Sequence, residues 1–214
     1  MFVYFYSIQP STRWKELVDI VKFQAGLAKA SNAITEFRML NNAAPMVVGI
    51  PADPNTYSQL CQVIDSSGPA GATPLCRHIN EVAAQVRAME PQLRANGHKA
   101  CVTICTDGQA SDGDVTAALK PLHQLPVWVV LRLCTDEQKV VNYWNSIDSQ
   151  LELELEILDD LSSEAKEVAK FNNWFTYGEP LHMLRQFGIA IKELDMLDEK
   201  KLTADQVRDV VAIM

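Results

Sequence analysis

Apolar side chains recur every three or four residues from Trp14 to Ala28. Because an α-helix turns about every 3.6 residues, this spacing places them on one helix face. Ser11 or Thr12 can cap this helix, which we expect to begin near Arg13. Before it, the aromatic and β-branched run from Phe2 to Tyr6 is typical of a strand. The pattern therefore predicts a strand followed by an amphipathic helix.

Two short stretches with strand character come next. Side chains alternate in character from Ala33 to Leu40, and Met46 to Ile50 is an apolar run. Asn41 and Asn42 between them are typical turn residues, so the segment is predicted to form a β-hairpin. A short helix is predicted after it, from Tyr57 to Ile64.

The densest cluster of helix-breaking residues, Ser66 to Pro74, precedes the longest helical pattern. Apolar residues then recur at helical spacing from Leu75 to Leu93, and the Asn96-Gly97 pair is a typical helix end. Thr73 is the predicted N-cap, with the proline after it at the first helical position, where no N–H is needed. Pro91 lies inside the pattern, so we expect it to kink the helix or to end it early.

Two apolar runs of the buried-strand type follow, from Ala100 to Cys105 and from Pro126 to Leu133. The polar loop Thr106 to Asp114 lies between them. Asp112 or Asp114 can cap a helix that should run from this loop to about residue 122.

A helix from Asp136 to Ile147 and a strand from Leu151 to Ile157 complete the alternating pattern. In the strand, leucine or isoleucine alternates strictly with glutamate, which predicts a half-exposed strand at a sheet edge. Beyond Asp160 the chain is predicted to be helical with loops. Tyr177 to His182 is typical of a loop followed by a helix start, and Thr203 to Gln206 is a capping box before the last helix.

Helices therefore alternate with strands up to about residue 160. This order is typical of an open, mostly parallel α/β sheet wound on both faces. We predict a doubly wound α/β domain over residues 1–160, and a helical C-terminal extension over residues 161–214 that packs on the same domain.

Composition and charge narrow the functional classes. The 214 residues include 27 acidic side chains and 19 Lys or Arg side chains, a formal net charge of −8. Such a chain lacks the basic surface that nucleic-acid phosphates require, and anionic lipids would repel it. Its apolar runs are also shorter than the ~20 residues that cross a bilayer. We therefore expect neither nucleic-acid binding nor membrane insertion.

The cysteines form an odd-numbered set without a C-x-x-C pair: Cys61, Cys76, Cys101, Cys105 and Cys134. This favours free thiols over a disulfide framework or a zinc site. No basic residue precedes Arg13, and no long apolar segment typical of a secretory signal is present there. We expect an intracellular, cytoplasmic location.

Three predicted loops lie where ligands bind in open α/β sheets, at the carboxyl ends of the strands or beside them: Ser7 to Thr12, Gly68 to Thr73 and Thr106 to Asp114. Two of them resemble motifs of the von Willebrand factor A-type (vWA) domain, also called the integrin I-like domain. Gly71-Ala72-Thr73-Pro74-Leu75 is similar to the family's G-G-T-P-L loop. Val102-Thr103-Ile104-Cys105-Thr106-Asp107-Gly108 is similar to its strand ending in T-D-G. The order of elements over residues 1–160 agrees with this Rossmann-like fold.

The resemblance implies a metal-ion-dependent adhesion site (MIDAS) that joins the three loops around Mg²⁺. Thr73 would supply a hydroxyl ligand, Asp107 a carboxylate that reaches the ion through water, and Ser11 a hydroxyl from the first loop. Mg²⁺ keeps several waters and needs oxygen donors in near-octahedral geometry, so such a set is chemically suitable. An acidic side chain of a partner protein would complete the shell.

The first loop departs from the family's D-x-S-x-S motif. Ser7 stands where the motif has aspartate and Gln9 where it has its first serine, so only Ser11 matches. Because ligand charge sets much of the affinity for divalent ions, this MIDAS-like site is degenerate and Mg²⁺ binding should be weak or absent. Alternatively, the sequence begins after the true motif.

These features predict a non-enzymatic protein-interaction module that binds a partner at the carboxyl edge of the sheet, with weak or lost Mg²⁺ dependence. The loop residues predicted to form this edge are Ser7, Gln9, Ser11, Thr73, Asp107 and Asp112. An alternative is a metal-dependent hydrolase or phosphotransferase that uses Asp107, Asp112 or Asp114, although no nucleophile, base or phosphate-binding loop is recognisable. A third hypothesis is a metal-free scaffold whose loops retain only their shape.

Overall fold

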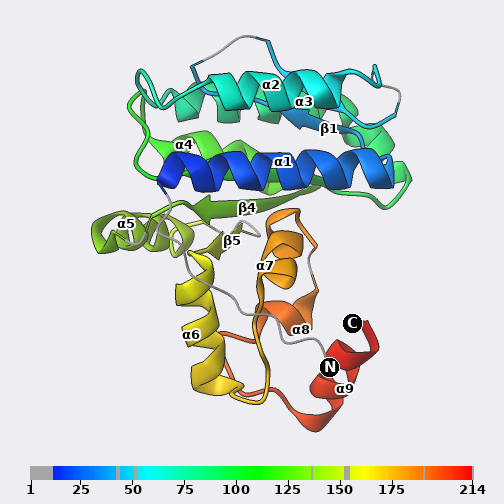
Figure 1. The fold of residues 1–214 in the computed structure, drawn as a ribbon, viewed down its shortest axis with the longest axis vertical. Helices are drawn as coiled ribbons and strands as arrows, with labels where there is room; N and C mark the ends of the chain where they lie inside the picture. The colour runs from blue at the N-terminus through cyan, green and yellow to red at the C-terminus, as the bar shows by residue number, and fades with distance from the viewer. Residues whose placement is uncertain are drawn as a thin grey trace. The chain divides into compact units, whose positions relative to one another are not determined.

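The computed structural model describes residues 12–41, 44–50, 53–135, 137–151, 155–189 and 191–213. It is mostly helical, with an antiparallel pair of strands and a parallel three-stranded sheet (Figure 1). Two compact units are present. The first contains the described residues of Met1–Glu36 and Met46–Pro69, and the second those of Phe37–Pro45 and Ala70–Met214. Within the described ranges, no helix has the length and apolar character needed to cross a membrane.

The first unit combines two helices with the short antiparallel pair. Its elements are α1 (Arg13–Ser31), β1 (Thr35–Phe37), β2 (Met46–Val48) and α2 (Thr56–Ser66). Thr12 caps α1, because its side chain accepts a hydrogen bond from the backbone N–H of Lys15 at 3.1 Å. Gly49 follows β2 with a φ of 100°, and a Cβ there would collide with the carbonyl oxygen of Ala33. The predicted helices and hairpin are confirmed, whereas the predicted strand Phe2 to Tyr6 lies outside the described residues.

The parallel sheet belongs to the second unit and has the order β3-β4-β5. Its strands are β3 (Ala100–Thr106), β4 (Val127–Leu133) and β5 (Leu155–Leu158). From β3 the chain passes through α4 (Val115–Leu119) and the 3-10 helix η1 (Lys120–Gln124) to β4, and then through α5 (Gln138–Asp148) to β5. These are helical crossovers between parallel neighbours, as parallel pairing requires. The predicted strands Ala100 to Cys105 and Pro126 to Leu133 are confirmed. The strand predicted from Leu151 to Ile157 is confirmed from Leu155 onward, whereas residues 152–154 lie outside the described residues.

The prediction that Pro91 ends the helix early is wrong, because α3 (Leu75–Ala95) continues past it. Proline removes one backbone hydrogen bond, which a helix held in the core by a buried stripe tolerates. That stripe lies N-terminal to it: Leu75, Cys76, Ile79, Ala83 and Val86.

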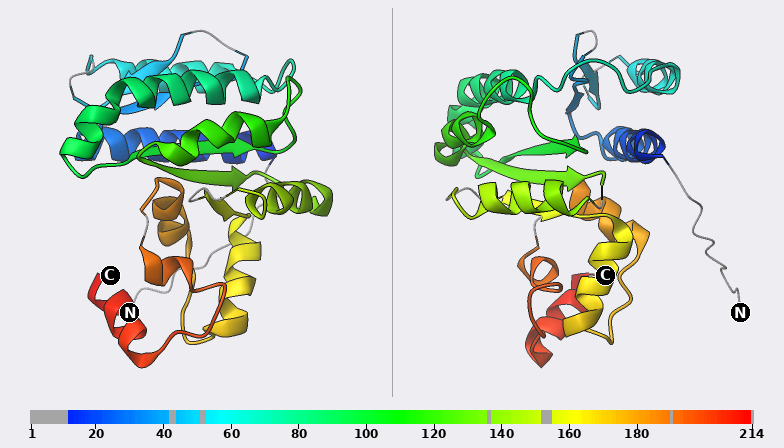
Figure 2. Two further views of the ribbon diagram at one scale, coloured as in Figure 1. Left: turned by 180° about the vertical axis from the view of Figure 1, so that it is seen from behind. Right: turned by 90° about the vertical axis from the view of Figure 1, so that its left-hand side faces the viewer.

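The two faces of the parallel sheet differ in chemistry. On one face, which we call the apolar face, Val127, Val129, Leu131 and Leu133 of β4 join a core with residues of α3, α4 and α5. The opposite face, which we call the polar face, carries Trp128 and Arg132 of β4, with Cys101 beside Trp128 on β3 and Glu156 on β5. Helix α7 (Glu179–Gln186) lies on the side of β4 opposite α4 (Figures 1 and 2).

The end of α7 is tied to the polar face by β3. The Thr103 hydroxyl donates a hydrogen bond to the backbone carbonyl of Gln186 at 2.9 Å, and the Cys101 thiol lies 3.7 Å from the carbonyl oxygen of Phe187. Helix α7 therefore covers the polar face.

The remaining helices of the second unit are α6 (Leu161–Phe171), α8 (Lys192–Asp195) and α9 (Ala204–Ile213). Together with the loops between them they bury a second apolar cluster: Val168, Tyr177, Leu194, Met196, Leu197, Leu202 and Val210. The capping box before α9 is confirmed, since the Thr203 N–H donates to Gln206 Oε1 at 2.9 Å and the Gln206 N–H donates to Thr203 Oγ1 at 3.4 Å. The predicted boundary at residue 160 stays a prediction.

The prediction for β5 is wrong in one respect. It is an edge strand of the described sheet, but its glutamate is not solvent-exposed, since Glu156 has only 7% of its surface accessible. Arg185 of α7 pairs with this carboxylate at 2.8 Å, and the pairing allows both charged groups to be buried.

Candidate functional site

The structure joins the second and third predicted loops at the carboxyl end of β3, and we call this region the loop edge (Gly71–Pro74 and Thr106–Asp114). The Thr73 N–H donates a hydrogen bond to the Ser111 hydroxyl at 2.9 Å, and the Ser111 N–H donates to the Thr73 carbonyl at 2.9 Å. This reciprocal pair links residues that are 38 positions apart. The first-loop residues Ser7, Gln9 and Ser11 lie outside the described residues.

Asp112 reaches across to the N-terminus of α3. Its Oδ1 accepts the N–H of Cys76 at 3.0 Å, and its Oδ2 accepts the N–H of Arg77 at 2.9 Å. Pro74 occupies the N-cap position, so the prediction that Thr73 caps the helix is wrong. The helix is instead capped by a carboxylate from a distant loop, because a free helix N-terminus offers unpaired N–H groups to any nearby acceptor.

The capping contacts change the acidity of Asp112. Partial desolvation raises the pKa of its carboxyl, but the N–H groups of Arg77 and Cys76 outweigh this and lower the pKa overall. The carboxylate is therefore held in its charged form, which suits its position at a helix N-terminus.

Asp114, two residues after Asp112, also caps a helix. Its side chain accepts the N–H of Thr116 at 2.9 Å and caps α4, as predicted for this residue. The prediction left open whether Asp112 or Asp114 caps this helix, and the structure assigns the two carboxylates to two different helices.

The Thr106-Asp107-Gly108 turn is held by hydrogen bonds within the turn and from the core. The Gly108 N–H donates to the Thr106 hydroxyl at 3.3 Å, and the Gly108 carbonyl accepts the indole N–H of Trp144 at 3.1 Å. Trp144 is fully buried in the apolar core. Asp107 is exposed between these two anchored neighbours.

Asn41 holds the other side of the loop edge. Its Nδ2 donates to the carbonyls of Ala70 at 2.7 Å and Ala72 at 2.6 Å. Gly71 between them has a φ of 83°, and a Cβ there would lie 3.1 Å from the Asn41 side chain. Glycine is required at this position by both its backbone conformation and the close approach of Asn41.

The described residues of the loop edge do not by themselves form a Mg²⁺ site. Both oxygens of Asp112 and the hydroxyl of Ser111 accept hydrogen bonds from backbone N–H groups. Throughout the described ranges, no group of three or more His, Cys, Asp or Glu side chains could hold a metal ion. Of the implied ligands, Thr73 and Asp107 lie within the described residues and Ser11 lies outside them.

A second cluster of polar groups, which the sequence did not predict, lies on the polar face. Arg185, with 2% of its side chain exposed, contacts Glu156 at 2.8 Å, Glu164 at 3.1 Å and Asp198 at 3.6 Å. It also donates to the Tyr177 hydroxyl at 3.2 Å. We call these five residues the Arg185 cluster.

One arginine cannot neutralise the two buried carboxylates of Glu156 and Glu164 and the partly buried one of Asp198, so the pKa values of these carboxyl groups shift. Desolvation raises the pKa of Glu164 to about 8, with the attraction of Arg185 opposing and the charge of Asp198 adding to the rise. Desolvation also raises the pKa of Glu156, against the opposing effect of Arg185. At neutral pH, Glu164 is therefore mostly protonated.

His182 lies beside the Arg185 cluster and is neutral. Its Nδ1 lies 3.1 Å from the Tyr177 hydroxyl. Desolvation, together with the positive charges of Arg132 and Arg185, lowers the pKa of His182 to about 3.

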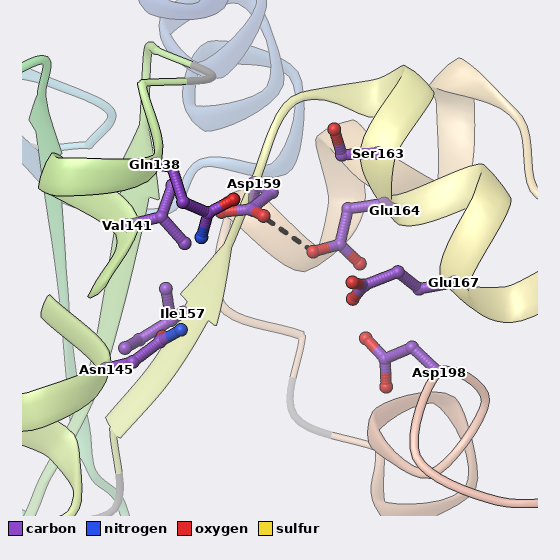
Figure 3. A pocket seen from close by; sticks show the side chains of 9 residues that line it. All are labelled: Gln138, Val141, Asn145, Ile157, Asp159, Ser163, Glu164, Glu167 and Asp198. Carbon is purple, nitrogen blue, oxygen red and sulfur yellow. Dashed lines mark hydrogen bonds between the residues drawn. The ribbon is translucent and has the colours of Figure 1, made fainter.

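A cavity of about 310 Å³ lies next to Glu164 (Figure 3). Four of its side chains are acidic, namely Asp159, Glu164, Glu167 and Asp198. Glu164 is fixed at this cavity by the Asp159 N–H, which donates to its Oε1 at 3.0 Å. Desolvation raises the pKa of Asp159, and the charge of Glu167 adds to the rise. Carboxyl groups with raised pKa values therefore occur at this cavity as well as in the Arg185 cluster.

The sequence carried only indirect signals for this second cluster. Glu156 belongs to a strictly alternating strand, which favours an exposed glutamate, and Tyr177 and His182 belong to a segment to which no chemistry could be attached. Only the packing of α7 on β5 brings Glu156 to Arg185.

Comparisons with known protein families, curated proteins and solved structures give no match to this chain. The likeness to the vWA domain therefore rests on the two quoted motifs and on the order of elements.

Proposed function

We propose that this chain is a non-enzymatic protein-interaction module that binds a partner protein at the loop edge, with weak or lost Mg²⁺ dependence. The proposal includes a doubly wound, vWA-like sheet, of which β3, β4 and β5 would form part. The observation that carries it is the reciprocal bonding of Thr73 and Ser111 together with the Asp112 cap. These contacts join two loops that are distant in sequence into one exposed surface.

A surface of this kind is suited to binding. Loops on a rigid scaffold often carry recognition, and loops that are already ordered lose less conformational entropy when a partner binds. Asp107 is exposed on the loop edge, and its neighbour Gly108 accepts a hydrogen bond from Trp144. The backbone that carries the Asp107 side chain is thus anchored to the core.

Whether Mg²⁺ is bound at the loop edge determines which chemical group of the partner can contact Asp107. Two carboxylates in contact repel each other unless a cation lies between them. An acidic partner side chain would therefore require Mg²⁺ held with the help of Ser11, as the vWA resemblance implies. Without the ion, Asp107 favours a basic or hydrogen-bond-donating partner group.

The alternative of a hydrolase or phosphotransferase receives no support from the loop edge. Two of its three candidate carboxylates, Asp112 and Asp114, accept hydrogen bonds from helix N-termini. They are structural caps and are not directed at a shared reacting centre. The proposed cytoplasmic location is supported by the five cysteines, which are all free thiols.

The test is affinity capture from an extract of the source cells with the immobilised 214-residue chain, using Asp107→Lys as the variant. Asp205→Lys on α9 is the matched control, because it makes the same charge change on an exposed residue of another surface. We expect a partner to be retained by wild type and by the control and to be depleted at least about tenfold by Asp107→Lys, the loss expected when a central contact is reversed in charge. Equal retention by Asp107→Lys would refute the loop edge as the binding site.

Asp112→Ala sharpens the test. Loss of a helix cap costs about 1 kcal/mol, and the loop edge loses one of its ties, so partner binding should weaken while the fold remains. Adding a chelator of divalent ions shows whether partner binding requires Mg²⁺. Unchanged binding supports a loop edge that binds its partner without metal. Complete loss of binding would contradict the proposed weak or lost Mg²⁺ dependence.

A further inference from the structure

The outer edge of β5 is open within the part of the chain that the structure describes. In the order β3-β4-β5, β4 pairs with one edge of β5, and no described strand pairs with the other. Alternate residues of an edge strand direct their N–H and C=O groups away from the sheet, where these groups can pair with an added strand. Protein partners bind to such edges by adding an extended segment to the sheet.

The cavity of about 310 Å³ next to Glu164 adjoins β5 from both sides of the sheet. Ile157, which lines it, packs against the apolar core. Glu164 and Asp198, which also line it, contact Arg185 on the polar face. Because β4 occupies the inner edge of β5, these two walls can meet only around the outer edge or the end of the strand.

The α5 side of the cavity shows that it follows the strand. Gln138, Val141 and Asn145 line it, and residues 138 to 145 span about 10 Å of helix axis. The four residues of β5 span about 13 Å. The cavity therefore extends along the outer edge, over a length that suits three or four residues of an extended chain.

The two walls of the cavity differ in chemistry. Figure 3 shows the carboxylates of Glu164, Glu167 and Asp198 together on one side, and Val141 and Ile157 on the other. Side chains of an extended segment alternate between opposite sides of its backbone. A segment paired with β5 would therefore place every second side chain against the carboxylates and the others against the apolar wall.

The charge at the cavity stays negative when its surroundings are included. None of the described residues that line it is basic. The carboxyl groups that line it or lie against its lining include Glu156, Asp159, Asp160, Glu164, Glu167 and Asp198. The cations that interact with these groups are Arg132, Lys170 and Arg185. Even with a proton on Glu164 the carboxylates outnumber these cations, so a basic segment is complementary to the cavity.

We propose that the outer edge of β5 and this cavity bind an extended segment of a partner protein in which lysine or arginine alternates with apolar residues. The backbone of the segment pairs with β5. Its basic side chains contact Glu164, Glu167 and Asp198, and its apolar side chains pack on Val141 and Ile157. The site shares no residue with the loop edge, so it is a second interaction surface.

The first test is fluorescence anisotropy of a labelled peptide, Val-Arg-Val-Arg-Val, titrated with the 214-residue chain. We expect saturable binding that weakens as salt is added. A peptide of the same composition without the alternation, Val-Val-Val-Arg-Arg, should bind at least about tenfold more weakly. The acidic peptide Val-Glu-Val-Glu-Val should not bind, because its carboxylates meet those of the cavity. Equal binding of the two basic peptides would overturn the proposal.

Glu167→Lys tests the acidic wall. Glu167 has 46% of its side chain exposed, so its replacement leaves the core unchanged, and the reversed charge should weaken binding of Val-Arg-Val-Arg-Val by at least about tenfold. Glu81→Lys on α3 is the matched control, because Glu81 has 47% of its side chain exposed, also forms an ion pair and does not line the cavity. It should bind like wild type. Unchanged affinity in Glu167→Lys would refute the acidic wall as the binding surface.

Two measurements test the pairing of backbones. In the complex, hydrogen exchange of β5 amides should slow, because their outward N–H groups become hydrogen-bonded. N-methylation of either the arginines or the valines of the peptide removes the N–H groups of alternate residues. Only one of these sets faces β5, so we expect one methylated peptide to lose binding and the other to retain it. Equal binding of both methylated peptides, or unchanged exchange in β5, would overturn the proposed strand addition.

Discussion

The two faces of the parallel sheet are built on the same strands by different physical means. Along β4, Val129 and Leu131 enter a core formed with α3, α4 and α5, whereas Trp128 and Arg132 point to the opposite face. That face is covered by α7, which brings Arg185 to Glu156. One face thus depends on the burial of hydrocarbon, and the other on the pairing of buried charges.

The difference affects how each face responds to change. Burial of apolar surface is non-directional and does not involve protons, so its contribution is independent of pH. A buried charge is stable only with its partner, and removal of one partner leaves the other uncompensated. We therefore expect the polar face to be the more sensitive to single substitutions and to pH.

The largest effect is expected for Arg185→Met. Removal of the guanidinium leaves Glu156, Glu164 and Asp198 without their cation, and breaking a buried pair costs about 3–5 kcal/mol of unfolding free energy. The loss should be greater at pH 8 than at pH 6, because the carboxylates can take up protons at the lower pH. Urea unfolding measures both values.

The control for this variant is Lys170→Met, at a lysine with 64% of its side chain exposed. It should change the free energy of unfolding by less than about 0.5 kcal/mol. Adding Glu156→Met to Arg185→Met should recover part of the loss, since replacing both partners removes the unpaired charge. A small, pH-independent loss in Arg185→Met would show that the charges are not paired as described.

A somewhat smaller loss is expected for Leu131→Ala on the apolar face. Leu131 is fully buried in the core, and truncation of such a leucine costs about 3 kcal/mol through lost transfer energy and the cavity left behind. The loss should be the same at pH 6 and pH 8 in urea unfolding. A clear dependence on pH would mean that the two faces are coupled.

The smallest effect is a change in pH dependence for Glu164→Gln. In the folded chain the pKa of Glu164 is about 8, whereas an ordinary glutamate, as in the unfolded chain, has a pKa of 4.5. The folded state therefore binds more protons than the unfolded state between these two pH values. Stability must therefore fall as pH rises through this window, by at most about 1.4 kcal/mol per pH unit.

His182 opposes this trend at lower pH. Its pKa is lowered from 6.5 to about 3, so the unfolded state binds more protons between these values and stability rises with pH there. The two effects oppose each other most strongly below pH 6.5, and the decline due to Glu164 is the larger effect between pH 6.5 and 8. We expect wild type to lose about 1–2 kcal/mol across this interval and Glu164→Gln to lose little.

Glu167→Gln is the matched control for this prediction, because Glu167 is on the same helix, lines the same cavity and has 46% of its side chain exposed. It should retain the decline of wild type. An identical pH profile for wild type and Glu164→Gln would contradict the assignment of a raised pKa to Glu164.

Local features of the fold could be predicted from the sequence. The cap of α1 at Thr12, the cap of α4 at Asp114 and the Thr203–Gln206 capping box each involve residues within three positions of one another. The strands and helices between Leu75 and Leu158 follow from periodicity, because each element shows its apolar pattern in its own residues. Pro91 is the exception, since a helix anchored by earlier turns tolerated it.

The candidate sites were less predictable. Proximity of Thr73 to the Thr106–Asp114 loop was expected from the vWA resemblance, but the contacts with Ser111 and the capping of α3 by Asp112 were not. The Arg185 cluster was missed, because the alternation around Glu156 indicated an exposed side chain.

The sequence by itself therefore determined the order of elements up to about residue 160, most local caps and the buried character of β4. These follow from interactions between residues close in the chain and from the burial of apolar side chains. Only the tertiary structure decided which carboxylate caps α3 and which charged residues are buried on the polar face. Arg185 lies 29 positions from Glu156, and a charge can be buried only where folding supplies its partner.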